Sequence, residues 1–174
     1  MLEAKIESAL NNQIAMECKA SFVYLSMANW CEQEGLSGCA QFLFQHSEEE
    51  RNHMLKLIHY INSVDGKAII PQVTSGKDSW EGIRPLIEEV YEHEKKVTAS
   101  IHEMVALSQE LKDYRTLNFL QWYVDEQMEE ENLVKDILDT IKLIGNGPQS
   151  LYYINKELLK RSEEEAAAEE EYEK

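Results

Sequence analysis

Four polar residues interrupt the apolar faces of four long helical segments, and their spacing constrains the fold more than any other feature. Glu17 and Glu50 are 33 residues apart, and Glu94 and Gln127 are separated by the same 33 residues. Each occupies a position where the helical period calls for an apolar side chain. An offset of 77 residues maps the first pair onto the second. Two helix pairs related by a pseudo-two-fold axis would therefore bring all four groups to one depth in a common core.

The periodic segments predict an all-α fold, a four-helix bundle. Only 7 glycines and 3 prolines are present in 174 residues, and apolar residues recur at helical spacing. The expected helices span about residues 3–34, 38–64, 83–110 and 113–144. Gly35 ends the first helix, and Asp113 can cap the last. The short connections make the helices antiparallel within each pair.

Residues 65–82 form a connection that is too long for a hairpin, and glycine and proline interrupt its periodicity. Some seventeen extended residues reach about 55 Å, whereas the second helix is about 40 Å long. We therefore expect one long crossover that travels the length of the bundle and makes the second and third helices parallel. Its isolated apolar residues are expected to pack against the bundle: Ile69, Ile70 and Val73.

The chain is expected to finish with a short fifth C-terminal helix and an acidic tail. Leu151, Ile154 and Leu158 share one face of a helix over about residues 149–161, which is too short to be stable unless it docks. Residues 163–174 contain seven Glu and one Lys. We expect residues 1–161 to form the bundle with its fifth helix, and residues 162–174 to form a solvated, mobile tail.

Composition limits the partners and the compartment. The net charge of −16 argues against nucleic acid or an anionic membrane surface and favours cations. The sequence has no run of eighteen apolar residues, so no membrane span is expected, and it lacks a signal-peptide pattern, which favours a cytoplasmic location. Cys18, Cys31 and Cys39 are odd in number and lack Cys-x-x-Cys spacing, so we expect buried thiols.

The second helix carries a carboxylate and an imidazole within its apolar face. Glu50 and His53 are three residues apart and therefore point to the same side. The 77-residue offset maps His53 onto Glu130. Four glutamates, which include Glu17 and Glu94, bring four negative charges that two divalent cations would neutralise. Since oxygen ligands with one imidazole suit iron or manganese, we predict a dinuclear metal site with one bridging glutamate.

Further acidic residues flank the buried face. Glu49, Glu126 and Glu129 lie at its edge and could hold another, more hydrated cation. Glu-Glu-Glu runs at residues 48–50 and 129–131 are ordinarily solvated faces, but they occupy similar positions in the two halves. The sequence leaves both interpretations open.

Nearby aromatic residues and histidines also allow two interpretations. Tyr24, two turns from Glu17 on the same face, either serves the site by a hydrogen bond or electron relay, or is an ordinary core tyrosine. Trp122 is interpreted as a packing residue, with a redox role as the alternative. His46 is interpreted as a supporting or packing residue one turn before Glu50. We expect the other histidines to be surface or packing residues: His59, His93 and His102.

The motif set is similar to that of the bacterial non-haem ferritins. It comprises Glu17, Glu50-x-x-His53, Glu94 and Gln127-x-x-Glu130, with Phe119-Leu120-Gln121-Trp122-Tyr123 ahead of the last motif. The resemblance covers about residues 1–161 and implies a ferritin-like bundle with one long crossover. It further implies an iron store: a homo-oligomeric shell of roughly 24 subunits that oxidises Fe(II) with dioxygen or peroxide and keeps the ferric mineral.

The resemblance also implies two iron positions that share a bridging carboxylate. The ligands of the first iron would be Glu17, Glu50 and His53, and those of the second would be Glu50, Glu94 and Glu130. Gln127 would hydrogen-bond nearby or orient dioxygen, and Tyr24 matches a tyrosine beside the centre. The third iron site typical of bacterial members would be served by Glu49, Glu126, Glu129 and Glu130.

Two departures distinguish the chain from related families. Gln127-x-x-Glu130 lacks the histidine of symmetric di-iron proteins, which argues against bacterioferritin, rubrerythrin-like peroxidases and di-iron oxygenases. Arg51 follows the bridging glutamate at the position of the haem methionine of bacterioferritin, so no haem is expected. Two other classes remain: a di-iron or di-manganese redox enzyme without storage, and a structural bundle that uses its acidic tail for interaction.

Overall fold

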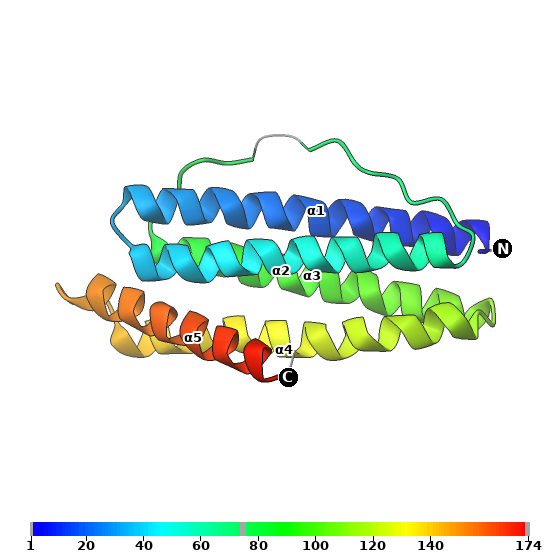
Figure 1. Cartoon of the computed structure of the whole chain (residues 1–174). Helices are drawn as coiled ribbons and strands as arrows, with labels where there is room; N and C mark the ends of the chain where they lie inside the picture. The colour runs from blue at the N-terminus through cyan, green and yellow to red at the C-terminus, as the bar shows by residue number, and fades with distance from the viewer. Residues whose placement is uncertain (1, 74–75, 173–174) are drawn as a thin grey trace.

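The structure is a computed structural model that describes residues 2–73 and 76–172, with side chains described up to residue 167. The described residues form five helices: α1 (Ala4–Gln33), α2 (Ser37–Ser63), α3 (Ile83–Glu110), α4 (Tyr114–Ile144) and α5 (Ser150–Tyr172). The first four lie along one another as a bundle, and α5 packs obliquely on its side (Figure 1). The prediction of an all-α four-helix bundle with an additional C-terminal helix is confirmed.

Local signals fix the ends of the paired helices. The Glu3 carboxylate caps α1 by accepting a hydrogen bond from the Lys5 backbone N–H at 2.7 Å. The Asp113 carboxylate caps α4 by accepting from the Thr116 backbone N–H at 3.2 Å, as the sequence predicts. Gly35 has a φ of 74° just after α1, a conformation that glycine adopts without strain. Tight turns therefore make α1 antiparallel to α2 and α3 antiparallel to α4 (Figure 1).

The segment between α2 and α3 runs the length of the bundle, as expected (Figure 1). Asn11 holds it to α1 through two backbone contacts, a bond to the Lys67 carbonyl at 3.0 Å and one from the Ile69 N–H at 2.7 Å. The expectation for the apolar side chains is wrong, because Ile69, Ile70 and Val73 are exposed. The hydrogen bonds with Asn11 are made by the backbone of this segment.

A layer of polar groups divides the core of the bundle into two hydrophobic clusters. In α1, Leu10 and Ile14 belong to one cluster, and Ala20 and Tyr24 belong to the other. Glu17 lies between them and is itself buried. Each of the other long helices also has a buried polar residue between the two clusters: Glu50 in α2, Glu94 in α3 and Gln127 in α4. The equal spacing noted in the sequence therefore corresponds to one level of the fold.

Helix α5 is longer than expected and docks on the same chain. It continues from Ser150 to Tyr172 rather than ending near residue 161, because its Ala- and Glu-rich end favours helix. Ile154 and Leu158 are buried as expected, but Leu151 is exposed, so the predicted apolar face is only partly correct. The mobility of the residues after 161 stays a prediction. Within the described ranges, no helix combines the length and the apolar character needed to cross a membrane.

Helix α5 docks on the first residues of α2. The Asn155 side-chain oxygen of α5 accepts hydrogen bonds from the backbone N–H groups of Gly38 and Cys39 at 2.8 and 3.0 Å. Leu36 precedes α2 and offers it no side-chain cap, so α5 satisfies N–H groups that would otherwise need water. A Cβ atom at Gly38 would lie 2.1 Å from the Asn155 carbonyl oxygen. Glycine is therefore required at this helix contact.

Candidate metal centre

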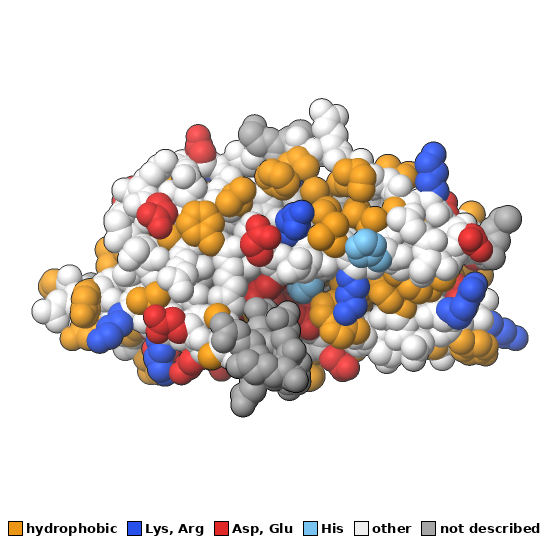
Figure 2. Space-filling view, viewed as in Figure 1, with side chains coloured by type: hydrophobic (Ala, Val, Ile, Leu, Met, Phe, Trp, Pro, Cys, Tyr) orange, Lys and Arg blue, Asp and Glu red, His pale blue; other side chains and the backbone are white. Residues whose placement is uncertain are grey.

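The polar layer gathers six side chains from all four long helices. Their exposed fractions run from 1% to 8%. The residues are Glu17 from α1, Glu50 and His53 from α2, Glu94 from α3, and Gln127 and Glu130 from α4. Acidic and histidine side chains are visible together near the middle of the face shown in Figure 2. The helical spacing thus carried every one of these predicted residues into the core.

Three of the six offer a ready set of metal ligands. One ligand atom each from Glu17, Glu50 and His53 lie within 4.8 Å of one another. The His53 Nδ1 atom is 3.6 Å from the Glu50 Oε2 atom. The Oε2 atoms of Glu17 and Glu50 are buried and have no hydrogen-bond partner among the described residues. Because buried polar atoms are normally partnered, these oxygens point to a cation that completes the group.

Burial and crowding change the protonation of these carboxyls. Burial, followed by the charge of Glu50, raises the pKa of Glu17 well above 4.5. Burial and then the charge of Glu94 raise the pKa of Glu50, and the same two causes raise that of Glu130. Without a cation, the group therefore retains protons that ordinary glutamates have lost. A metal ion that binds here must displace them.

Glu94 is the ionised member of the layer. Burial alone would raise its pKa, but contacts with His93, Tyr24 and Gln127 outweigh burial and lower it. The Tyr24 hydroxyl donates to the Glu94 Oε1 atom, and the Gln127 amide donates to Oε2 at 3.2 Å. Burial raises the pKa of Tyr24, which keeps it a donor. Of the two roles left open for Tyr24, the structure places a hydrogen bond to a site carboxylate.

Two residues that contact the polar layer, Gln13 and His93, were not predicted from the sequence to do so. Gln13 is completely buried and donates to the Glu17 Oε1 atom at 2.8 Å, while the Ser100 hydroxyl donates to Gln13 at 2.6 Å. Gln13 lies four residues before Glu17, so this polar pair on one helix face was a usable signal. His93, expected at the surface or in packing, contacts the Tyr24 ring edge-on at 5.8 Å between centroids.

Glu126 faces the outer nitrogen of His53. Its Oε1 atom is 3.6 Å from the His53 Nε2 atom, whereas His53 Nδ1 faces Glu50. Burial lowers the pKa of His53, but the Glu126 contact and the nearby carboxylates raise it above 6.5 on balance. A carboxylate on the second nitrogen of a ligating histidine fixes the tautomer and the ring orientation. In this structure Glu126 faces His53 and is not among the residues of the compact Glu17–Glu50–His53 group.

We expect Glu126→Gln to weaken binding of a divalent cation at the Glu17–Glu50–His53 group by about ten-fold, because supporting partners typically contribute this much. The pKa of His53 should fall, because its outer carboxylate is lost. Calorimetric titration with Zn²⁺ and histidine NMR would measure the two effects. Asp125→Asn makes the same charge change on an exposed neighbour and is the control. Unchanged affinity in Glu126→Gln would contradict the supporting role.

A second group lies beside the first. One ligand atom each from His46, Glu49 and Glu130 lie within 4.8 Å of one another. His46 is buried, and its Nδ1 and Nε2 atoms are 3.3 Å from Glu49 and 3.6 Å from Glu130. The sequence interpreted His46 as a supporting or packing residue, and the structure has both kinds of contact: its ring packs on Phe42, and its nitrogens face carboxylates. Glu129 is exposed and belongs to neither group.

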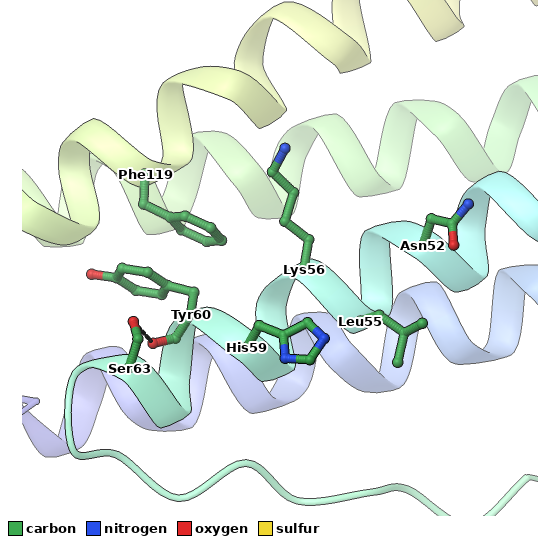
Figure 3. A pocket seen from close by; sticks show the side chains of 7 residues that line it. All are labelled: Asn52, Leu55, Lys56, His59, Tyr60, Ser63 and Phe119. Carbon is green, nitrogen blue, oxygen red and sulfur yellow. Dashed lines mark hydrogen bonds between the residues drawn. The ribbon is translucent and has the colours of Figure 1, made fainter. Parts of the chain in front are cut away.

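A surface groove between α2 and α4 is lined by aromatic and basic side chains, and none of its described lining residues has a carboxylate (Figure 3). Lys56 lines this groove and projects from α2 toward α4, where its Nζ atom lies 3.3 Å from the centre of the Trp122 ring. Tyr60 stacks on Phe119 with 3.8 Å between ring centres. Trp122 also contacts the His53 ring edge-on. These contacts support packing for Trp122, and the groove contains no residue of either carboxylate group.

A protein-family comparison matches residues 7–144 to the ferritin-like domain of the Ferritin family. The chain is 41% identical over 158 residues to a probable bacterial non-heme ferritin-like protein of Haemophilus influenzae, covering 91% of this chain and 96% of the relative. It is 43% identical over 152 residues to a bacterial non-heme ferritin of Campylobacter jejuni, covering 87% and 91%.

Solved structures give a consistent result. An open pore ferritin from the archaeon Archaeoglobus fulgidus superposes with a TM-score of 0.88 at 37% sequence identity. The match covers 91% of this chain and 96% of that chain. Similarity in sequence and in backbone thus extends over the bundle that holds the polar layer.

Proposed function

Because this chain belongs to the ferritin family, we propose that it is an iron store with ferroxidase activity. The observation that carries the proposal is the polar layer, where four glutamates and one histidine converge and two carboxylate oxygens, on Glu17 and Glu50, have no partner among the described residues. Iron is the substrate and the cargo in this proposal. The similarity to bacterial non-heme ferritins and the donor set of the layer support it together.

The arrangement suggests how two Fe(II) ions would be held. Glu17, Glu50 and His53 would bind the first ion, and Glu50, Glu94 and Glu130 the second, with Glu50 as the bridge. Four carboxylates neutralise the charge of two divalent ions, which removes the cost of burying these anions together. Gln127 and Tyr24 hold Glu94 in place by the hydrogen bonds described above.

Oxidation would transfer one electron from each Fe(II) to the oxidant, dioxygen or peroxide. Each ferric ion then carries one more positive charge than the carboxylates balance, and water that binds to it loses protons more readily. The product therefore favours hydrolysis to a ferric oxyhydroxide. An asymmetric ligand set with one histidine suits a product that must leave, whereas structural metals are held by closed sets.

The second group would serve the iron that leaves or enters. We expected Glu49, Glu126, Glu129 and Glu130 to hold a third iron; the structure gathers His46, Glu49 and Glu130 as the compact set. A third ion bound by Glu130 would share that carboxylate with the second ion of the dinuclear site. Storage further requires a closed shell, for which we propose an assembly of roughly 24 copies in the cytoplasm.

Mixing anaerobic Fe(II)-loaded protein with air tests the proposal. We expect ferric absorbance to develop far faster than in protein-free buffer, and native mass measurements to show an assembly that retains hundreds of irons, on the order of a mineral particle. Retention of about two irons per chain after oxidation would favour the alternative, a di-iron or di-manganese redox enzyme. A monomer that binds no iron would reject both.

A further inference from the structure

The amide of Gln45 on α2 links α5 to the second carboxylate group. Its oxygen accepts a hydrogen bond from the Ser162 hydroxyl at 2.8 Å. Its nitrogen donates to Glu49 Oε1 at 3.2 Å and to Glu165 Oε2 at 3.4 Å. An amide nitrogen has two hydrogens, so both donors are used. The orientation of Gln45 is therefore fixed from both sides, by α2 and by α5.

The contribution of α5 arises from its unexpected length. Ser162 and Glu165 lie beyond residue 161, where the sequence predicted the helix to end, and α5 continues to Tyr172. Ser162 is 1% exposed, so its hydroxyl is held in the contact between α5 and α2. The family match ends at residue 144, before α5 begins. The contact is thus formed by a segment that the family match does not include.

The carboxylate that Gln45 holds is the one that faces His46. While Glu49 Oε1 accepts from Gln45, Glu49 Oε2 lies 3.3 Å from His46 Nδ1. Both nitrogens of His46 and the Oε2 atom of Glu130 are buried without a hydrogen-bond partner among the described residues. These orphaned atoms, all in one group, indicate a ligand that completes them.

We propose that α5 positions a ligand of this second metal group. Ser162 acts through Gln45 to hold Glu49 toward His46 and Glu130, and Glu165 adds the next carboxylate on the way to the surface. The ligand is a divalent cation, because one imidazole and carboxylate oxygens are its usual donors. The inference rests on the proposed function only in taking this group to be a cation site.

Calorimetric titration of the full-length, metal-free protein with Zn²⁺, which undergoes no oxidation, tests the inference. We expect binding at the Glu17–Glu50–His53 group and a further event that His46→Ala abolishes. The double variant Ser162→Ala/Glu165→Gln should weaken that further event by about ten-fold and leave the others within about two-fold. Glu163→Gln, which removes one charge from an exposed position of α5, should leave all events unchanged.

A second variant separates positioning from docking. Gln45→Leu changes no residue of α5, although it removes the Gln45 hydrogen bonds with Ser162 and Glu165. It should weaken the same event as the double variant does. A loss of helix content in the double variant alone would show that α5 has detached. Affinity equal to the parent in Gln45→Leu would overturn the inference. Zn²⁺ binding that Glu17→Gln does not weaken would instead overturn the proposed function, so the two failures are distinguishable.

Discussion

Glu50→Gln should reduce the rate of Fe(II) oxidation by about a hundred-fold or more, while the metal-free protein stays at least as stable as the parent. The amide keeps the size of the side chain but cannot bridge two cations or cancel their charge. Glu50 is 3% exposed, and its pKa is raised by burial and by Glu94. Removing this buried acid therefore removes an unfavourable group from the metal-free fold and an essential one from the loaded site.

Stopped-flow absorbance and chemical denaturation measure the two effects in parallel. The matched control is Glu48→Gln, which changes the same charge on the same helix at an exposed position. Its oxidation rate should equal that of the parent. A Glu50→Gln protein that oxidises iron at the parent rate would reject Glu50 as the bridging ligand. A rate that falls together with stability would show misfolding rather than loss of a ligand.

The metal-free protein should lose stability as the pH rises from about 4.5 toward neutral, and a bound cation should reverse this loss. In the unfolded chain, glutamates ionise near their ordinary value of 4.5. In the folded chain, burial keeps the pKa of Glu17, Glu50 and Glu130 well above it. The native state therefore binds more protons than the unfolded state in this window, so the free energy of unfolding falls as protons are lost.

Glu94 contributes with the opposite sign but in a different range. Its pKa is lowered, so the stability that it contributes is present above its ordinary value and is lost in acid. The expected profile for the metal-free protein thus has its maximum in mild acid. Three raised carboxyls outnumber this one lowered carboxyl between pH values of about 5 and 7.

Unfolding curves at a series of pH values, with Zn²⁺ or with a chelator and at fixed protein concentration, measure this linkage. Zn²⁺ at a hundred-fold excess over its dissociation constant should stabilise the fold by about 2.7 kcal/mol per site at neutral pH. The gain should shrink in acid, where protons compete for the carboxyls. The Glu50→Gln variant should show a flatter profile without metal. Metal-free stability that climbs between mild acid and neutral pH would contradict the direction of these pKa shifts.

Helical periodicity was sufficient to predict the bundle and most of its centre. The apolar face of an amphipathic helix packs against the core. A polar residue on that face is therefore buried together with its apolar neighbours. Glu17, Glu50, Glu94 and Gln127 followed this rule, and their equal separations placed them at one level. The length of the connection over residues 65–82 was enough to predict the crossover, because chain reach is a simple geometric limit.

Periodicity does not say which atoms meet around a side chain. Glu126 and Glu49 have similar positions in the two halves of the sequence, yet Glu126 faces His53 and Glu49 faces His46. Helical angle gives the face of a residue to within a fraction of a turn, whereas a contact of this kind depends on the rotamer and on the neighbouring helix. The contact of His93 with the Tyr24 ring was hidden for the same reason.

The sequence by itself determined the helices, their pairing, the crossover and the level at which acids and a histidine enter the core, because these depend on period, length and charge along one chain. Only the tertiary structure decided that α5 docks on α2, satisfies the start of that helix through Asn155 and reaches Glu49 through Gln45. The contacts of α5 with Gly38 and Gln45 join residues more than one hundred positions apart. Their geometry is set by how two helices pack, which local pattern does not record.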